Sequence, residues 1–359
     1  MMIKGLDLKG RSLDSITNFT IEEVEYLVEL SMRVKKDKKL GNSQRKLLEG
    51  KNIVTLWEKD STRTRCSFDV AAFDMGMGVT YVGPQGSNYG KKESIEDTAI
   101  VLGNYYDGIQ FRGFSQEYVN VLARDSGVPV WNGLTNDEHP TQIIADLLTM
   151  VEEVGSFKNL KGKKFIFIGD YKNNMGHSEL LACAFAGMHC ILVGPDSYKK
   201  EMIEDTLKFA DKINAITGGS YSFSNDKMAA AKDVDFIYTD VWVSLGEDFS
   251  LFDSRIGELK EFQVDMAMMK AAKETVKFLH CLPAFHDLRT EFSIKVAKEL
   301  GTKYPLVKNG EIEVTDEVFQ SKYSIAFTEA ENRMHSIKAI MLATLAEPKV
   351  YENILKLEI

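Results

Sequence analysis

The feature that most constrains the fold is the alternation of short β-type runs with segments of helical periodicity. Four such runs occur in the first half of the chain: NIVTLW (52–57), VTYVG (79–83), GIQFRG (108–113) and VPVWNG (128–133). Five more occur in the second half: KKFIFIGD (163–170), CILVGP (190–195), YSFS (221–224), DFIYTDVWV (235–243) and VKFLHCLPA (276–284). Strands and helices that alternate in this way form parallel sheets with helices on both faces. The sequence therefore predicts an α/β protein.

The length of the chain predicts two domains. A chain of 359 residues with 44% hydrophobic content is long enough for two domains that each bury a full core. A helix is predicted between the two series of strands, because Pro140 suits a first helical turn and Gly155 suits a C-cap. We expect one domain over residues 1–150, a second over 151–328, and a C-terminal helix over 329–359 that returns to the first domain. Each domain should hold a parallel sheet flanked by helices.

Composition narrows the class of partner. The formal net charge is −9 and Lys and Arg are spread along the chain, which favours neither nucleic acid nor an anionic membrane surface as a partner. No apolar run approaches the ~18 residues that a membrane span needs. The N-terminus has neither the apolar core of a signal peptide nor the composition of a transit peptide, and the cysteines lack paired metal-ligand spacing. We therefore expect a cytoplasmic protein that acts on small molecules.

Polar clusters follow the predicted strands at six places. They are DSTRTR (60–65), Arg112, NDEHPTQ (136–142), GDYKNNMG (169–176), TDVWVSLG (239–246) and HCLPAFHD (280–287). In open parallel sheets, ligands bind outside the carboxyl ends of the strands. We therefore expect these clusters to form one active site in the cleft between the two domains.

The clusters of the first half are rich in hydrogen-bond donors. Their polar side chains are Ser61, Thr62, Arg63, Thr64, Arg65, Arg112, His139, Thr141 and Gln142. Alone, DSTRTR is equally typical of a capped, solvated turn. Donors that converge on a helix N-terminus, where backbone N–H groups are unpaired and the helix dipole is positive, form an anion site, and phosphate suits it best. The site is not a P-loop, because GxxxxGK[ST] is absent.

The clusters of the second half supply a different chemistry. They offer an amide, a carboxylate, a hydroxyl and a thiol: Asn174, Asp240, Ser244 and Cys281. Such a set suits a small zwitterion that carries an amino group. The absence of GxGxxG argues against a nicotinamide cofactor. Together the two half-sites predict group transfer from a phosphorylated anion to an amine.

Four motifs give the chain a resemblance to one enzyme family. STRTR (61–65), HPTQ (139–142), DVWVSLG (240–246) and HCLPAFHD (280–287) are similar in order and spacing to the motifs of ornithine carbamoyltransferases, and the resemblance spans residues 10–345. It implies transfer of the carbamoyl group from carbamoyl phosphate to the side-chain amine of L-ornithine, which gives L-citrulline and phosphate. It also implies no metal ion, no organic cofactor, and a homotrimer or a multiple of trimers.

The resemblance implies roles on the carbamoyl phosphate side. The phosphate group would be held by Ser61, Thr62, Arg63 and Thr64, and Arg333 from the last helix would reach back to the carbamoyl phosphate. The carbamoyl oxygen would accept hydrogen bonds from Thr64, Arg112 and His139, and Gln142 would bind the carbamoyl amino group. Asn88 would reach the ligand from a neighbouring subunit, although the family commonly has the longer Gln there. Arg65 either orients the loop, pairs with an acid or contacts ligand.

The resemblance also implies roles on the ornithine side. Asp240 would bind the α-amino group, and the α-carboxylate would be held by Asn174 and the backbone of Ser244 and Leu245. Cys281 and the carbonyl of Leu282 would lie at the attacking amine, with Cys281 as a hydrogen-bond partner rather than a covalent nucleophile. A buried hydrophobic cysteine at a strand end is the alternative for Cys281. The catalytic residues implied are Arg112, His139 and Cys281.

The alternatives differ in acceptor or in class. A putrescine enzyme has no α-carboxylate to hold and tends to lose the Ser-x-Gly loop, which stands here at 244–246. An aspartate enzyme typically reads His-Pro-x-Pro-Arg where this chain has HCLPA at 280–284. A non-catalytic binding protein would have replaced one or more of the site residues. A nucleotide-dependent dehydrogenase would respond to titration with NADH.

Overall fold

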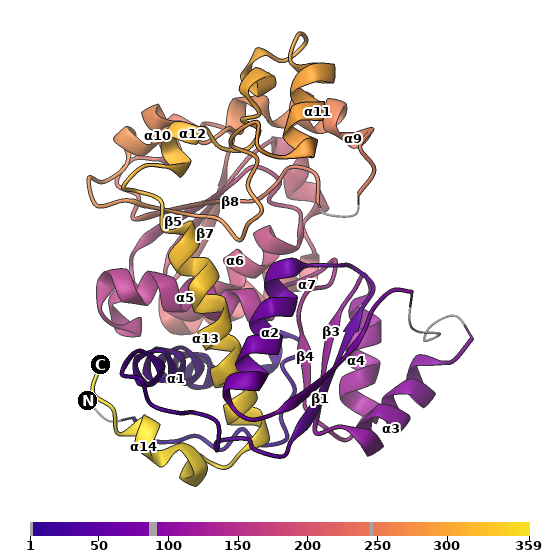
Figure 1. The fold of residues 1–359 in the computed structure, drawn as a ribbon. Coiled ribbons are helices and arrows are strands. Elements are labelled where there is room, and N and C mark those ends of the chain that lie inside the picture. Colours follow the sequence, from indigo (N-terminus) through magenta and orange to yellow (C-terminus); the bar gives the residue numbers. More distant parts are fainter. Residues whose placement is uncertain (1–2, 86–91, 245–246) are drawn as a thin grey trace. The chain divides into compact units, whose positions relative to one another are not determined.

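The computed structural model describes residues 3–85, 92–244 and 247–359. The chain forms two compact units, Met1–Glu153 with Glu331–Ile359 and Val154–Ala330 (Figure 1). Each unit contains one parallel sheet with helices packed against it, which confirms the predicted α/β class. The chain passes from one unit to the other at the end of α5 (Pro140–Val154) and within α13 (Ala326–Leu345).

The sheet of the first unit has the order β2-β1-β3-β4, with parallel pairing throughout. Its strands confirm the four predicted runs: β1 (Asn52–Trp57), β2 (Gly78–Val82), β3 (Gly108–Arg112) and β4 (Val130–Asn132). The order of winding reverses at β1, and such a reversal places the loops after the two adjacent strands next to each other. The register pairs Trp57 with Arg112, so DSTRTR begins beside Arg112.

Helices cover both faces of this sheet. The helices of this unit are α1 (Ile21–Lys39), α2 (Thr62–Asp74), α3 (Ile95–Tyr105), α4 (Gln116–Asp125), α5, α13 and α14 (Glu352–Leu355). On one face, Val54 belongs to a core that includes Leu122 of α4. On the other face, the Trp131 ring lies 6.2 Å from the Phe68 ring of α2, and its indole N–H donates to Thr344 of α13 at 3.0 Å.

The sheet of the second unit has the order β7-β6-β5-β8-β9 and is also parallel throughout. Its strands confirm the other five predicted runs: β5 (Lys164–Ile168), β6 (His189–Val193), β7 (Ser220–Ser224), β8 (Phe236–Thr239) and β9 (Lys277–Leu279). Its helices are α6 (Asn174–Ala186), α7 (Glu204–Thr217), α8 (Lys227–Ala230), α9 (Leu251–Leu259), α10 (Met266–Ala271), α11 (Glu291–Leu300) and α12 (Asp316–Phe319). Here the winding reverses at β5, which brings the loops after β5 and β8 together.

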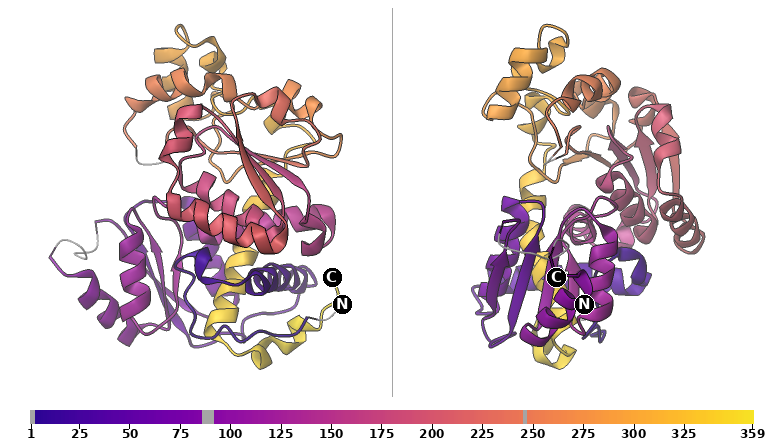
Figure 2. Two further views of the ribbon diagram at one scale, coloured as in Figure 1. Left: turned by 180° about the vertical axis from the view of Figure 1, so that it is seen from behind. Right: turned by 90° about the vertical axis from the view of Figure 1, so that its right-hand side faces the viewer.

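Local residues account for the bounds of α5, and a backbone hydrogen bond joins the segments near the two ends of the chain. Helix α5 begins at Pro140 as predicted, and it ends just before Gly155, whose φ of +88° is a left-handed conformation that favours glycine. The first described residues lie beside the C-terminal segment in the first unit, where the Ile3 N–H donates to the Leu355 carbonyl at 3.4 Å (Figure 2). Within the described part of the chain, no helix combines the length and apolarity needed to cross a membrane.

Glu138 joins the loop before α5 to the N-terminal segment. Its buried carboxylate accepts a hydrogen bond from the Ile16 N–H at 3.3 Å. Burial raises the pKa of Glu138 to about 7, against the opposing effect of hydrogen bonds from Ser15 and Ile16. An unperturbed Glu titrates near ~4.3, so Glu138 ionises more readily in the unfolded chain. The free energy of unfolding therefore falls as pH rises from about 4 to 7.

We expect Glu138→Gln to remove most of the fall in unfolding free energy with rising pH. The amide keeps the shape of the side chain and an acceptor oxygen, but it cannot ionise. The decrease in unfolding free energy between pH 5 and pH 8 should be smaller in the variant by ~2 kcal/mol. Urea unfolding at the two pH values measures it, with Glu22→Gln at an exposed position as the matched control. An identical pH dependence in wild type and Glu138→Gln would contradict the assignment.

Candidate active site

The loop after β1 delivers DSTRTR to the N-terminus of α2. Ser61 is the N-cap residue, and its hydroxyl accepts a hydrogen bond from the Thr64 N–H at 3.3 Å. Thr62 is exposed and Arg63 is half-buried on the first turn. The segment is thus a capped helix start. Because the cap satisfies one of the first-turn N–H groups, capping and anion binding are compatible at the same helix end.

Arg65 points to a different set of partners from the rest of its motif. Its guanidinium lies 3.8 Å from the centre of the Tyr81 ring, and its Nε is 3.7 Å from Oδ2 of Asp69 one turn along α2. Tyr81 in turn donates to the Asp60 carboxylate at 3.2 Å. Arg65 therefore links α2 to β2 through a cation–π contact and forms an ion pair within its own helix.

Arg333 is the centre of a buried polar cluster in the first unit. Its Nη2 is 3.3 Å from the Thr64 hydroxyl and 3.0 Å from Nε2 of His139. Its Nη1 donates to Oε1 of Gln142. All four residues are buried. Residues from positions 64, 139, 142 and 333 of the sequence thus meet at one point of the first unit, and their assignment to carbamoyl phosphate stays a prediction.

Arg112 adds a second buried guanidinium to this cluster. Its Nη1 donates to the Gly133 carbonyl at 3.0 Å and to the Thr64 hydroxyl at 3.4 Å. The first of these contacts fixes the side chain at the end of β4, and the second directs it to the start of α2. The Thr64 hydroxyl therefore lies between the guanidiniums of Arg112 and Arg333.

The hydrogen bonds around His139 define its protonation. Arginine has no acceptor, so Nε2 of His139 must accept from Arg333, and the ring proton lies on Nδ1, 3.5 Å from the Thr141 hydroxyl. Burial lowers the pKa of His139 well below its usual range, and the nearby charges of Arg333, Arg112 and Arg63 lower it further. His139 is therefore a neutral imidazole. It can donate from Nε2 only after Arg333 releases that nitrogen and the proton changes sides.

A second cluster forms in the second unit after β8 and β9. The Cys281 thiol donates to Oδ1 of Asp240 at 3.2 Å, and the Val241 N–H donates to the same oxygen at 2.8 Å. The other oxygen, Oδ2, accepts from the Asn173 amide at 3.4 Å. Asp240 is buried and Cys281 is half-buried. The predicted carboxylate and thiol therefore lie in contact.

Asn173 is a residue that the sequence analysis missed. It caps α6, with its Oδ1 accepting from the Gly176 N–H at 2.9 Å while its Nδ2 reaches Asp240. Asn174, which we expected to hold a carboxylate, is the first residue of α6. The Ser244 N–H donates to Glu247 at 2.6 Å. The predicted residues Asn88 and Leu245 lie outside the described part of the chain.

The HCLP loop is supported by buried groups that no local motif reveals. Leu282 has a left-handed φ of +57°, which is unusual for leucine. Its N–H donates to Nδ1 of His280 at 2.9 Å, and Nε2 of His280 is 3.2 Å from the Glu313 carboxylate. The His280 N–H donates to Glu329 at 2.9 Å, and Glu313 also accepts from the Phe285 N–H at 2.6 Å. These contacts set the direction of the Leu282 carbonyl.

Among the residues that the structure describes, two groups of side chains have the composition of metal ligands. They are Asp240, His280 and Cys281, and His286, Asp287 and Asp316, with ligand atoms within 4.8 Å of one another in each group. In the first group, Nδ1 of His280 accepts from Leu282 and Nε2 faces Glu313, so a metal would have to break the support of the loop. This donor set is therefore better suited to hold the loop than an ion.

Comparison with known families decides the class. The carbamoyl-P binding domain of aspartate/ornithine carbamoyltransferases matches residues 11–152, and their Asp/Orn binding domain matches residues 161–344. The chain belongs to the aspartate/ornithine carbamoyltransferase family. The boundary between the two matched regions falls near the end of α5, at the transition between the two units.

Individual members of the family are similar over almost the whole chain. The catabolic ornithine carbamoyltransferase of Malacoplasma penetrans (strain HF-2) is 63% identical over 341 residues, which cover 95% of this chain and 99% of that protein. That of Mycoplasma pneumoniae (strain ATCC 29342 / M129 / Subtype 1) is 57% identical over 346 residues, with coverage of 95% and 99%. The solved ornithine carbamoyltransferase from Pyrococcus furiosus has a TM-score of 0.83 at 35% identity and covers 95% of this chain and 98% of its own. The resemblance carried by the four motifs is confirmed.

In this member of the family, we expect the His139 ring to stay neutral at all pH values from 8 down to 6, because burial and three arginines disfavour its charged form. NMR of the protein with 13C-labelled histidine rings measures this, and the His139→Asn variant assigns the signal among the six histidines. A titration of the assigned signal centred near the ordinary value of ~6.5 would contradict the electrostatic account of the cluster.

Proposed function

We propose that the protein transfers the carbamoyl group between carbamoyl phosphate and the side-chain amine of L-ornithine. The reaction interconverts carbamoyl phosphate and L-ornithine with L-citrulline and phosphate. The observation that carries the proposal is that relatives named catabolic ornithine carbamoyltransferases are 50–63% identical to this chain over almost its whole length. The comparisons give no support to putrescine as the acceptor. The first unit would bind carbamoyl phosphate and the second would bind ornithine, with bounds near 1–150, 151–328 and 329–359.

The buried cluster around Arg333 suits the phosphorylated substrate. Attack on the carbamoyl carbon places negative charge on its oxygen, and Arg112, Thr64 and His139 would stabilise that charge as preorganised donors. The phosphate group leaves as an anion, which Arg333 and the start of α2 would neutralise. The α2 contacts would come from Ser61, Thr62, Arg63 and Thr64.

Arg333 would exchange partners when carbamoyl phosphate binds. Its guanidinium now contacts Oε1 of Gln142 and Nε2 of His139. These are the atoms proposed to bind the carbamoyl amino group and the carbamoyl oxygen. Movement of the guanidinium onto the phosphate would release both atoms, and a proton shift from Nδ1 to Nε2 would then make His139 a donor.

The cluster around Asp240 suits the amine. An aliphatic amine titrates near ~10.4 and cannot attack while protonated, so the site must favour its neutral form. Asp240 would bind the α-amino group, and Asn174 with the 244–245 backbone would bind the α-carboxylate. Cys281 and the Leu282 carbonyl would accept hydrogen bonds from the attacking amine. Exclusion of water from these contacts would favour the neutral form of the amine.

We place the enzyme in arginine metabolism in the cytoplasm, as a homotrimer or a multiple of trimers. The edge of the first sheet supports a homo-oligomer: β2 is an edge strand that is only partly buried, and large apolar side chains are exposed on β2 and on the helices α2 and α3. They are Val70, Phe73, Tyr81, Ile100, Val101 and Tyr105. The catabolic names of three relatives favour citrulline phosphorolysis as the direction in the cell.

A parallel assay tests the function. Purified protein with carbamoyl phosphate is given ornithine, putrescine or aspartate, and product formation is followed by a colorimetric assay for ureido groups. We expect citrulline from ornithine, with kcat/KM at least ~10²-fold above the values for the other two amines, because putrescine lacks the α-carboxylate and aspartate lacks a side-chain amine that could attack. Absence of product with ornithine, or a preference for putrescine, would overturn the proposal.

A further inference from the structure

Helix α13 is buried on nearly all sides, so the burial of an apolar stripe does not fix its rotation about its own axis. From Asn332 to Leu345 every residue except Met334 is buried. A surface helix is oriented by burying its one apolar stripe, but a helix buried on nearly all sides has no such preference. Specific polar contacts can set a unique arrangement in that case. Those nearest to Arg333 are the ones that would fix the position of its guanidinium.

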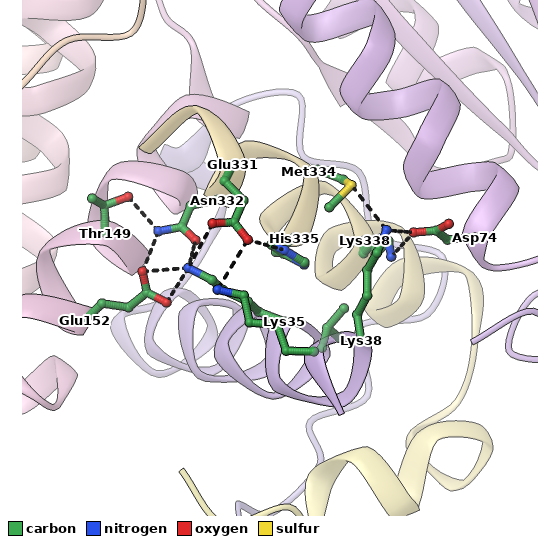
Figure 3. A network of polar contacts seen from close by, with 12 residues as sticks. Lys35, Lys38, Asp74, Thr149, Glu152, Glu331, Asn332, Met334, His335 and Lys338 are labelled. Atoms are coloured by element: carbon green, nitrogen blue, oxygen red, sulfur yellow. Dashed lines mark hydrogen bonds and ion pairs between the residues drawn. The ribbon is translucent and has the colours of Figure 1, made fainter. Parts of the chain in front are cut away.

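Asn332 makes three such contacts, and they join α13 to two other helices (Figure 3). Its Oδ1 accepts from Nζ of Lys35 on α1 at 2.7 Å. Its Nδ2 donates to the Thr149 hydroxyl at 2.9 Å and to the Glu152 carboxylate at 2.8 Å, both on α5. Lys35 and Glu152 form an ion pair of 2.6 Å beside it. The fully buried amide is thus held on both its oxygen and its nitrogen.

The same helix is tied to α2 two turns further along. Lys338 is fully buried, pairs with Asp74 at the end of α2 and donates to Gln44 at 2.9 Å. Lys38 of α1 pairs with the same carboxylate (Figure 3). The Lys338–Asp74 ion pair fixes α13 at a point further along the helix, whereas Asn332 fixes it at the residue next to Arg333.

We propose that Asn332 is a positioning residue, which fixes the rotation of α13 so that Arg333 meets Thr64, His139 and Gln142. The inference rests on the proposed function. Helix α5 carries Gln142 on its first turn and Thr149 further along, so one rigid helix connects the anchor to the site. The helix and its side chains have a radius of ~5–6 Å, and a rotation of ~10° moves the outer atoms by ~1 Å. A misplacement of that size costs ~10²-fold in rate at a catalytic site.

Asn332→Leu is the direct test, because it removes all three contacts while each of the three former partners keeps another polar interaction. Lys35 and Glu152 keep each other, and the Thr149 hydroxyl keeps the Ala145 carbonyl at 2.7 Å. We expect the KM for carbamoyl phosphate to rise ~10-fold or more, with the KM for ornithine changed less than ~3-fold. If this variant fails to fold, Thr149→Val removes one of the contacts and should shift the same KM in the same direction.

A double-mutant cycle separates positioning from general loosening of the helix. If Asn332 acts through Arg333, Asn332→Leu should change kcat/KM for carbamoyl phosphate less than ~3-fold in the Arg333→Ala background. The matched control is Thr344→Val, which removes the buried hydrogen bond that the Trp131 indole donates to the same helix. It should lower the melting temperature without the KM change. Equal effects in both backgrounds, or the same KM change in Thr344→Val, would overturn the inference. Failure of wild type to carbamoylate ornithine would instead overturn the proposed function.

Discussion

Three guanidinium groups around one neutral imidazole are the constraint on which the first unit depends. Arg333 and Arg112 are buried, and both contact the Thr64 hydroxyl. Like charges repel strongly where water is excluded, and the same field keeps His139 uncharged. Carbonyl, amide and hydroxyl oxygens offset part of the repulsion. An anionic ligand would offset far more, so the positive charge of the cluster suits the phosphorylated substrate that we propose for it.

The support of both half-sites lies one layer behind the groups that would touch substrate. In the first unit, Asn332 holds the helix that carries Arg333. In the second, His280 and two buried carboxylates hold the backbone of Leu282 beside Cys281. Both supports use side chains whose hydrogen bonds are fixed by burial. Such preorganisation is what electrostatic stabilisation of a transition state requires.

Much of the fold could be predicted because it follows from local pattern and from topology. Nine strands matched their predicted runs, and the central ones read as short apolar segments because they are buried on both faces. The polar clusters could be placed at strand ends because the ligand rule for parallel sheets applies to any such chain. The convergence of residues 64, 139, 142 and 333 needed the family motifs, because they are far apart in sequence.

The supporting residues could not be predicted, because their partners are distant and their motifs are not distinctive. Glu313 and Glu329 look like surface acids in the sequence, yet both are fully buried. Asn173 and Asn174 differ only in which one caps α6, which depends on the exact helix start. The role of Arg65 was open until its position against Tyr81 and Asp69 was known.

The central claim is that the cluster around Arg333 is an anion site built from crowded positive charge. Isothermal titration of wild type and Arg333→Ala with inorganic phosphate tests it most directly, with the melting temperature of each protein measured in phosphate-free buffer. The account predicts phosphate affinity at least ~10-fold lower in the variant, since a charge-assisted contact is lost, with little or no fall in melting temperature because repulsion among the arginines is relieved. Equal phosphate affinity in the two proteins would contradict it.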